Sequence, residues 1–206
     1  MTREKKIYLL LTDTGTILNR MIKTYTKKPY NHASIAFDAD LMEVYSFGRK
    51  TANNPFIGGF VREDMNWLLF NKAECAIYSL TISEDEFQKM HMFIQAIDSK
   101  KEEYRYNFIG LFGVLLKKPI NRKKAFFCSQ FVASVLKESS IIQFKEKHLS
   151  LVKPCDLTCS ANFQLVYEGR LRDYQTCATS TTGAVVAPGI LHNRPRDVRV
   201  LYSKLG

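Results

Sequence analysis

The chain has 206 residues, of which 46% are hydrophobic and 24% are charged, and its formal net charge is +10. This length fits one domain, or one domain with a tail, and the composition is that of a folded globular protein rather than a disordered one. The longest apolar runs are shorter than the roughly 18 to 20 residues that a membrane span needs, which excludes a predicted spanning helix.

The N-terminal region does not have the pattern of a secretion signal. "MTREKK" is followed by the short apolar run "IYLLL", with no adequate apolar core and no small-residue cleavage site after it. We therefore expect a cytoplasmic protein, or one that is exported by a route that the sequence does not reveal.

The cysteine pattern favours neither a disulfide framework nor a metal site. The five cysteines are odd in number and scattered. Cys155 and Cys159 form a pair with His148 upstream, but no second ligand pair follows at the spacing of a zinc site. We expect no metal and no cofactor.

The positive charge is spread over short runs such as "REKK", "KTYTKK", "LLKK" and "NRKK", and no nucleic-acid-binding motif organises them. The simplest interpretation is a solvated basic surface. Contact with an anionic polymer or a membrane surface stays open, whereas nucleic acid is not an expected partner.

The first half of the chain predicts mostly strands. Residues 6–12 predict a strand, and the apolar spacing over 16–25 predicts a helix that ends before "KKPYN". Residues 32–37 and 41–47 predict the two strands of a hairpin about "DAD". The Asn-, Pro- and Gly-rich segment 48–64 is interpreted as a loop.

The second half mixes strands and helices. Residues 74–82 predict a strand, and Ser83 with Glu86 forms a capping box that begins a helix. Residues 104–116 predict a helical or loop-helix segment, 126–141 an amphipathic helix, 153–157 a turn and 163–171 a last strand. The buried face of the helix that begins after Ser83 is expected to comprise Phe87, Met90, Phe93, Ile94 and Ile97.

This order predicts an α+β fold with a mainly antiparallel sheet packed with helices. The folded domain is expected to span 1–172. Residues 173–206 show weak periodicity and are interpreted as a C-terminal extension.

Cys128 falls in the first turn of the predicted 126–141 helix. The free N–H groups and the macrodipole at a helix start stabilise a thiolate and lower its pKa, and a nearby histidine would lower it further. The same N–H groups can hold the oxyanion of a tetrahedral intermediate. The alternative is a structural cysteine buried between Phe127 and Phe131.

His32 begins the first hairpin strand, and Glu43 lies on the returning side. Pairing about the turn places Glu43 near the turn and His32 near the open end. Only twist, a bulge or the length of the glutamate side chain would bring them together. Taken alone, His32 is also consistent with a capping or surface histidine.

These motifs together resemble a known family. "TDTGTILNRMIKTYTKKPYNHASIAFDADLMEVYSFG", followed much later by "FFCSQFVASVLKES", resembles the circularly permuted papain-like fold of the NlpC-type superfamily. Its YiiX-type branch, which also resembles lecithin–retinol acyltransferase, is the most similar. The resemblance covers residues 6–170.

The resemblance implies that Cys128 is a nucleophile, that His32 is its base and that Glu43 orients the imidazole. The register of Glu43 departs slightly from the family pattern, so Tyr45 or Ser46 is an alternative for the third role. The glutamine of the papain oxyanion hole has no clear counterpart. The candidates for that support are Tyr106 and Asn107, and no role is expected for His91, His148 or His192.

The function implied by the resemblance is a cysteine hydrolase of the peptidase or amidase class, acting through an acyl-enzyme on peptide or cell-wall-type substrates. Two alternatives stay open. One is a thiol acyltransferase or lipid-directed hydrolase, with a lipid ester or amide as substrate, that uses the same Cys128–His32 pair. The other is a non-catalytic binding module on the same fold.

Overall fold

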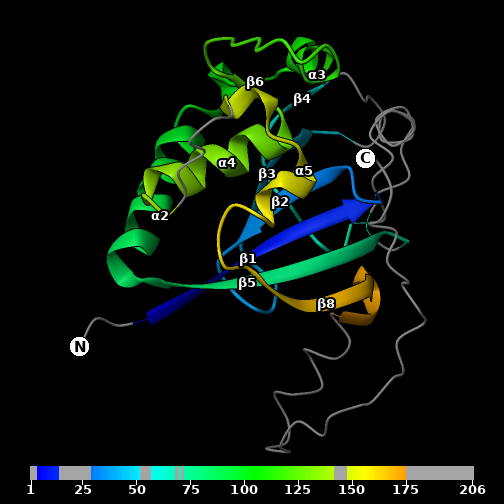
Figure 1. Cartoon of the computed structure of the whole chain (residues 1–206), viewed down its shortest axis with the longest axis vertical. Helices are drawn as coiled ribbons and strands as arrows, with labels where there is room; N and C mark the ends of the chain where they lie inside the picture. The colour runs from blue at the N-terminus through cyan, green and yellow to red at the C-terminus, as the bar shows by residue number, and fades with distance from the viewer. Residues whose placement is uncertain are drawn as a thin grey trace, which may run out of the picture.

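The computed structural model describes residues 4–13, 29–51, 57–67, 70, 72–141 and 148–174. Its centre is a six-stranded antiparallel sheet in the order β4-β3-β2-β1-β5-β8, with two helices, α2 and α4, beside it (Figure 1). The α+β class with a mostly antiparallel sheet is therefore confirmed.

The strands of the sheet are β1 (Glu4–Asp13), β2 (His32–Ala36), β3 (Val44–Arg49), β4 (Gly58–Arg62), β5 (Glu74–Ser83) and β8 (Gln164–Arg170). A separate parallel pair consists of β6 (Arg105–Tyr106) and β7 (Ala125–Phe126). The helices are α2 (Glu84–Asp98), α3 (Phe108–Leu115), α4 (Cys128–Glu138) and α5 (Pro154–Leu157), with short 3-10 turns η1 (Lys101–Glu103) and η2 (Leu149–Leu151).

The central strand β1 pairs with β2 and β5 at its edges and packs into a core on each face of the sheet. Its alternating side chains supply two cores. Ile7, Leu9 and Leu11 pack with the buried faces of α2 and α4, whereas Leu10 packs with Ala36 and other residues on the opposite face of the sheet. The two helices therefore cover one face and hold the start of α4 against the strands.

Helix α2 begins as the sequence predicts. The Ser83 backbone N–H donates to Glu86 Oε2 at 2.7 Å, and the Glu86 N–H donates to Ser83 Oγ at 3.3 Å, which completes the capping box. Of the predicted apolar face, Met90, Ile94 and Ile97 are buried, and Phe87 and Phe93 pack partly against the same core.

The segment 48–64 contains a strand, so its interpretation as a loop is wrong. β4 pairs with β3 from Tyr45–Arg62 to Arg49–Gly58. The glycines that suggested a loop allow close packing instead. A Cβ on Gly58 would lie 2.9 Å from the Gly48 carbonyl oxygen and 2.9 Å from Tyr106 Cβ.

The remaining elements fall close to their predicted positions. The 104–116 segment forms β6 and α3, α4 begins at Cys128 itself, and the turn predicted at 153–157 closes into the short helix α5. The helix predicted over 16–25 lies outside the described residues, as does the chain after residue 174. No helix among the described residues is long and apolar enough to cross a membrane.

Candidate active site

Cys128 is the first residue of α4 and is 4% exposed. The preceding residue, Phe127, is extended (φ −107°, ψ 168°), and no side chain caps the helix start. The backbone N–H groups of the first turn are thus not taken up by a capping side chain. The Cys128 thiol donates to the Asn31 carbonyl oxygen at 4.0 Å, which shows that the helix start packs against the beginning of β2.

His32, the first residue of β2, is held by a carboxylate on one side and faces the thiol on the other. Its Nε2 lies 2.7 Å from Glu63 Oε1, and the two side chains are 14% and 7% exposed. The imidazole also shares a hydrogen bond with Cys128. Because Glu63 occupies Nε2, Nδ1 is the ring nitrogen left for the thiol.

Glu63, directly after β4, is fixed by two further donors. Ser34 Oγ donates to Oε2 at 2.6 Å, and Ser46 Oγ donates to Oε1 at 2.6 Å. The β2–β3 ladder stops at Ile35–Tyr45. The hydroxyl groups on both strands beyond that point bond to the Glu63 carboxylate, which satisfies the buried charge on several sides.

Glu43 does not orient His32, which corrects the expectation from the sequence. The Phe37 N–H donates to the Glu43 carbonyl oxygen at 3.1 Å, so Glu43 stands opposite Phe37, roughly 16 Å along the strand from His32. Its carboxylate accepts from Tyr45 Oη at 2.9 Å and lies 3.7 Å from His91 Nδ1. Tyr45 and Ser46 were the alternatives for this role. Ser46 contacts Glu63, which in turn contacts His32, whereas Tyr45 bonds to Glu43.

The three buried groups shift one another's pKa toward the charged forms. Burial lowers the pKa of His32, but the Glu63 charge and the hydrogen bonds with Cys128 and Glu63 raise it to about 10. Burial raises the pKa of Cys128, and the hydrogen bond and charge of His32 bring it below its ordinary value. Burial likewise raises the pKa of Glu63, whereas His32 and the two serine hydroxyls lower it.

Tyr106 is the phenol closest to this group. It reaches the site because β6 pairs with β7, two residues before Cys128. Burial, and then the charge and hydrogen bond of Cys128, raise the pKa of Tyr106 well above its ordinary value, while an interaction with the Cys128 backbone lowers it. The phenol therefore keeps its proton and is a donor beside the thiol and the helix start.

Asn107 has a different role. Its Oδ1 accepts from the Gly110 N–H at 2.9 Å, and its Nδ2 donates to the Ile120 carbonyl oxygen at 3.3 Å. These bonds cap α3 and fix the loop after it. Of the two residues expected to support an oxyanion, only Tyr106 is placed beside Cys128.

Several buried polar atoms near Cys128 have no hydrogen-bond partner. They are Thr12 Oγ1, Asn31 Nδ2 and Oδ1, and Gln130 Oε1. The backbone carbonyl oxygen of Thr12 accepts from the Asn31 backbone N–H at 3.1 Å, and Gln130 lies in the first turn of α4. Buried polar atoms without partners are uncommon in proteins, so these four atoms stand out among the buried polar groups.

Among the described residues, Cys75, His91 and His148 have different surroundings. Burial raises the pKa of the Cys75 thiol to about 12, so it stays protonated. His148 is held by Asn121 and Ser150, and His91 packs between Phe37 and Phe87. Within the part of the chain that the structure describes, no three His, Cys, Asp or Glu side chains are grouped to hold a metal ion.

No protein-family model matches this chain, and no curated protein sequence or solved structure matches it either. What the site does must therefore be inferred from its own geometry.

Proposed function

We propose that the protein is a cysteine hydrolase that cleaves an amide or ester bond, with Cys128 as nucleophile, His32 as acid and base, and Glu63 as the orienting carboxylate. One observation carries the proposal. A buried thiol, imidazole and carboxylate follow one another in a line, at a helix start, with the thiol pKa lowered and the imidazole pKa raised. The resemblance to the permuted papain-like fold supports the roles of Cys128 and His32, whereas the role of Glu63 rests on its hydrogen bond with His32.

In the first half-reaction, the Cys128 thiolate forms a bond to the substrate carbonyl carbon, and the C=O electron pair moves to the oxygen. The Cys128 backbone N–H and the Tyr106 phenol are the donors that stabilise this oxyanion. When the intermediate collapses, the C–N or C–O bond breaks, and the His32 imidazolium gives its proton to the leaving amine or alcohol.

In the second half-reaction, neutral His32 takes a proton from water, and the resulting hydroxide attacks the thioester carbonyl carbon. Collapse breaks the C–S bond, releases the free acid and restores the thiolate–imidazolium pair. Glu63 stays ionised throughout, because Ser34, Ser46 and His32 all lower its pKa. Its role is to fix the ring and to favour the imidazolium.

The unpaired polar atoms favour an amide over an ester as substrate. The Asn31 side chain offers one donor and one acceptor without partners. A peptide amide presents the complementary acceptor and donor, whereas an ester has no N–H. This complementarity, together with the NlpC-type resemblance, supports a peptidase or amidase acting on peptide or cell-wall-type substrates.

Acylation by p-nitrophenyl acetate tests the mechanism without knowledge of the natural substrate. We expect a burst of nitrophenol and an acetyl group on Cys128, located by mass spectrometry. Cys128→Ser should give neither result. His32→Ala should acylate slowly, and any acetyl group that forms should persist, because nothing activates the water.

The matched control is Cys159→Ser, since Cys159 is an exposed cysteine away from this cluster. This variant should behave as the wild type. Acylation of Cys159 in preference to Cys128, or equal acylation of Cys128 with and without His32, would show that the pair has no nucleophilic function.

A further inference from the structure

Helix α3 and its C-cap expose three large apolar side chains, and the two glycines of the helix are buried. Ile109, Phe112 and Leu116 are 51%, 58% and 68% exposed, and their spacing places them on one side of the helix. Gly110 and Gly113 are buried. A Cβ on Gly113 would lie 2.6 Å from the Lys118 carbonyl oxygen, so the inward face fits only glycine.

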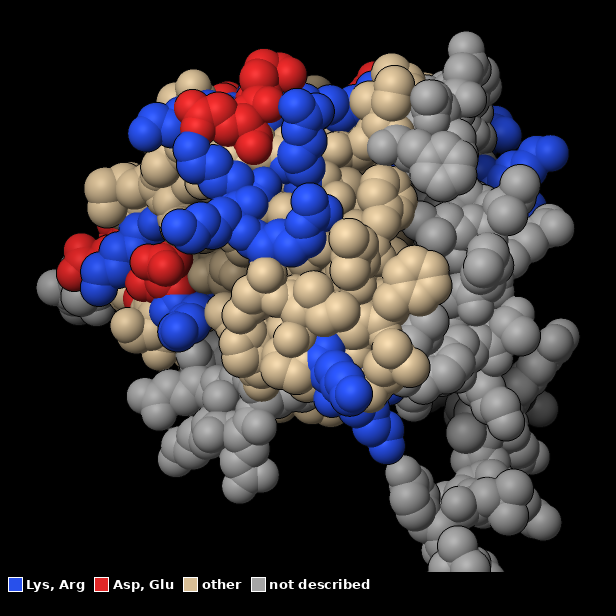
Figure 2. All heavy atoms as spheres, turned by 90° about the horizontal axis from the view of Figure 1, so that it is seen from above, with Lys and Arg blue, Asp and Glu red and all other residues tan. Residues whose placement is uncertain are grey.

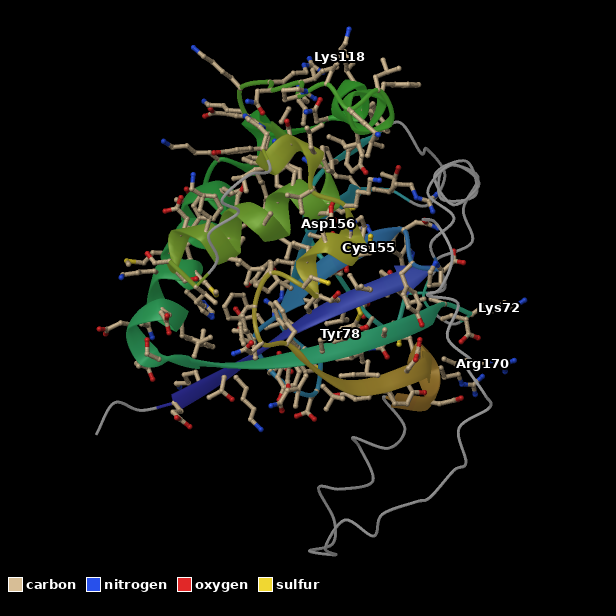
Figure 3. All side chains as sticks on the ribbon, viewed as in Figure 1. Lys72, Tyr78, Lys118, Cys155, Asp156 and Arg170 are labelled. Carbon is tan, nitrogen blue, oxygen red and sulfur yellow. The ribbon has the colours of Figure 1, made fainter. Side chains whose placement is uncertain are left out.

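The surroundings of this apolar face are basic. Between residues 107 and 124 the sequence has no Asp or Glu, and five Lys and Arg residues follow the helix: Lys117, Lys118, Arg122, Lys123 and Lys124. All five are exposed, and Lys124 pairs with the Glu103 carboxylate. Figure 2 looks down on this end of the molecule and shows Lys and Arg side chains beside a broad uncharged area. Lys118 points away from the body of the protein (Figure 3).

We propose that this surface, made of the outer face of α3 and the five cations after it, docks onto an anionic lipid bilayer. Apolar side chains that project from a short helix next to lysine and arginine match the interface of a membrane, where the side chains enter the acyl boundary and the cations meet the headgroups.

Charge decides between a bilayer and a second copy of this chain. The net charge of +10 opposes the approach of two basic faces, whereas an anionic surface attracts them. The three apolar side chains are each more than half exposed, as insertion into a membrane interface requires. An anionic lipid surface is therefore the occupant that complements both the shape and the charge.

The position of α3 relates docking to the candidate active site. Asn107, the N-cap of α3, directly follows Tyr106, which lies beside Cys128. A bilayer in contact with α3 would hold the candidate active site close to the membrane surface. Docking itself needs no thiol, so Cys128→Ser should bind vesicles as the wild type does, and the two proposals can fail separately.

Vesicle sedimentation tests the proposal with the full chain. We expect the protein to bind vesicles of phosphatidylcholine with about one-third phosphatidylglycerol, to bind much less to phosphatidylcholine alone, and to be released by added salt. Phe112→Ser should weaken binding about tenfold. The double variant Lys117→Gln/Lys118→Gln should weaken it roughly 20-fold, since each surface cation contributes about fivefold.

Matched controls lie elsewhere on the surface. Leu165→Ser removes an exposed apolar side chain of β8, and Lys89→Gln removes an exposed cation of α2. Neither should change binding. The proposal fails if the wild type does not bind anionic vesicles, or if the α3 variants bind as tightly as the controls. It also fails if the wild type forms a dimer that Phe112→Ser abolishes, since the occupant would then be a second copy.

Discussion

The Glu63 carboxylate lies 2.7 Å from Nε2 of His32, although the two residues are 31 positions apart in the sequence. The strand that follows the predicted hairpin leads to this contact, which places a buried carboxylate on the same imidazole that interacts with Cys128. Most of what we expect from the site depends on this pair.

The alkylation rate of Cys128 should show that its thiolate forms at unusually low pH. With the pKa of Cys128 lowered and that of His32 raised to about 10, the thiolate–imidazolium pair is the prevailing form between those two values. The rate with iodoacetamide should therefore be level through neutral pH and fall as acid protonates the thiolate. In His32→Ala it should drop roughly five- to tenfold at pH 7, because an ordinary thiol with a pKa of about 8.5 is mostly protonated there.

Mass spectrometry resolves the individual cysteines, so Cys75 and Cys159 serve as controls within one sample. Cys75, buried and with a pKa of about 12, should react slowest. If Cys128 were as inert as Cys75, the thiol would be a core residue and the hydrolase proposal would be wrong.

Loss of the Glu63 carboxylate should destabilise the fold far more than loss of Glu43. Glu63→Ala leaves His32, Ser34 and Ser46 buried without their shared partner, which we expect to cost about 3–5 kcal/mol in the free energy of unfolding. Glu43→Ala removes a half-buried carboxylate bonded to Tyr45, at a cost of about 1 kcal/mol. Urea denaturation measures both. Equal costs would contradict the assignment of Glu63 as the buried partner.

The stabilisation by Glu63 should depend on acid pH. Its pKa in the folded chain is below the ordinary 4.5, so the unfolded chain binds a proton first as the pH falls. The advantage of the wild type over Glu63→Gln is therefore fully present above pH 4.5 and disappears as the pH drops through the lowered pKa. A series of urea titrations from pH 7 to pH 3 checks this. A difference that stays constant over that range would mean that Glu63 is not ionised in the folded protein.

Tyr106→Phe should lower kcat without changing KM. The phenol hydrogen-bonds with Cys128 in the structure and becomes a donor to the developing oxyanion, while the Cys128 backbone N–H remains, so we expect a loss of roughly 10- to 100-fold. Tyr104→Phe is the matched control, because the Tyr104 ring stacks on Phe126 in the same region and should keep its place without its hydroxyl. A rise in KM alone in Tyr106→Phe would assign the phenol to substrate binding instead.

Local patterns in the sequence predicted most of the fold. The β-rich run of β1, the hairpin of β2 and β3, and the capping box of α2 depend on residues close together in the chain, and each of these elements is present. β4 was not predicted because Gly58 and Gly59 have the composition of a loop. What makes them a strand is the close approach of Gly48 and Tyr106, residues distant in the sequence.

The carboxylate partner of His32 could not be found for the same reason. Glu43 matched the spacing of the family pattern best, but strand pairing places it at the far end of β2. Glu63 reaches His32 only because β4 pairs with β3. One pattern in the sequence could have indicated this partner. In "YSFGRKTANNPFIGGFVRE" a loop is followed by a possible third strand, and a third strand beside the hairpin would bring Glu63 toward His32.

The short parallel ladder between β6 and β7 holds together the two ends of the segment that connects them. Tyr106 stands beside Phe126, and all of α3 and its basic loop lie between them. Because the two ends are already held together, changing the length of this excursion costs little closure entropy, about 0.6 kcal/mol for each doubling. The segment between β6 and β7 should therefore tolerate insertions, deletions and replacement. A graft of different length and chemistry there would leave the phenol and the thiol where they are, while altering what the protein meets at that end.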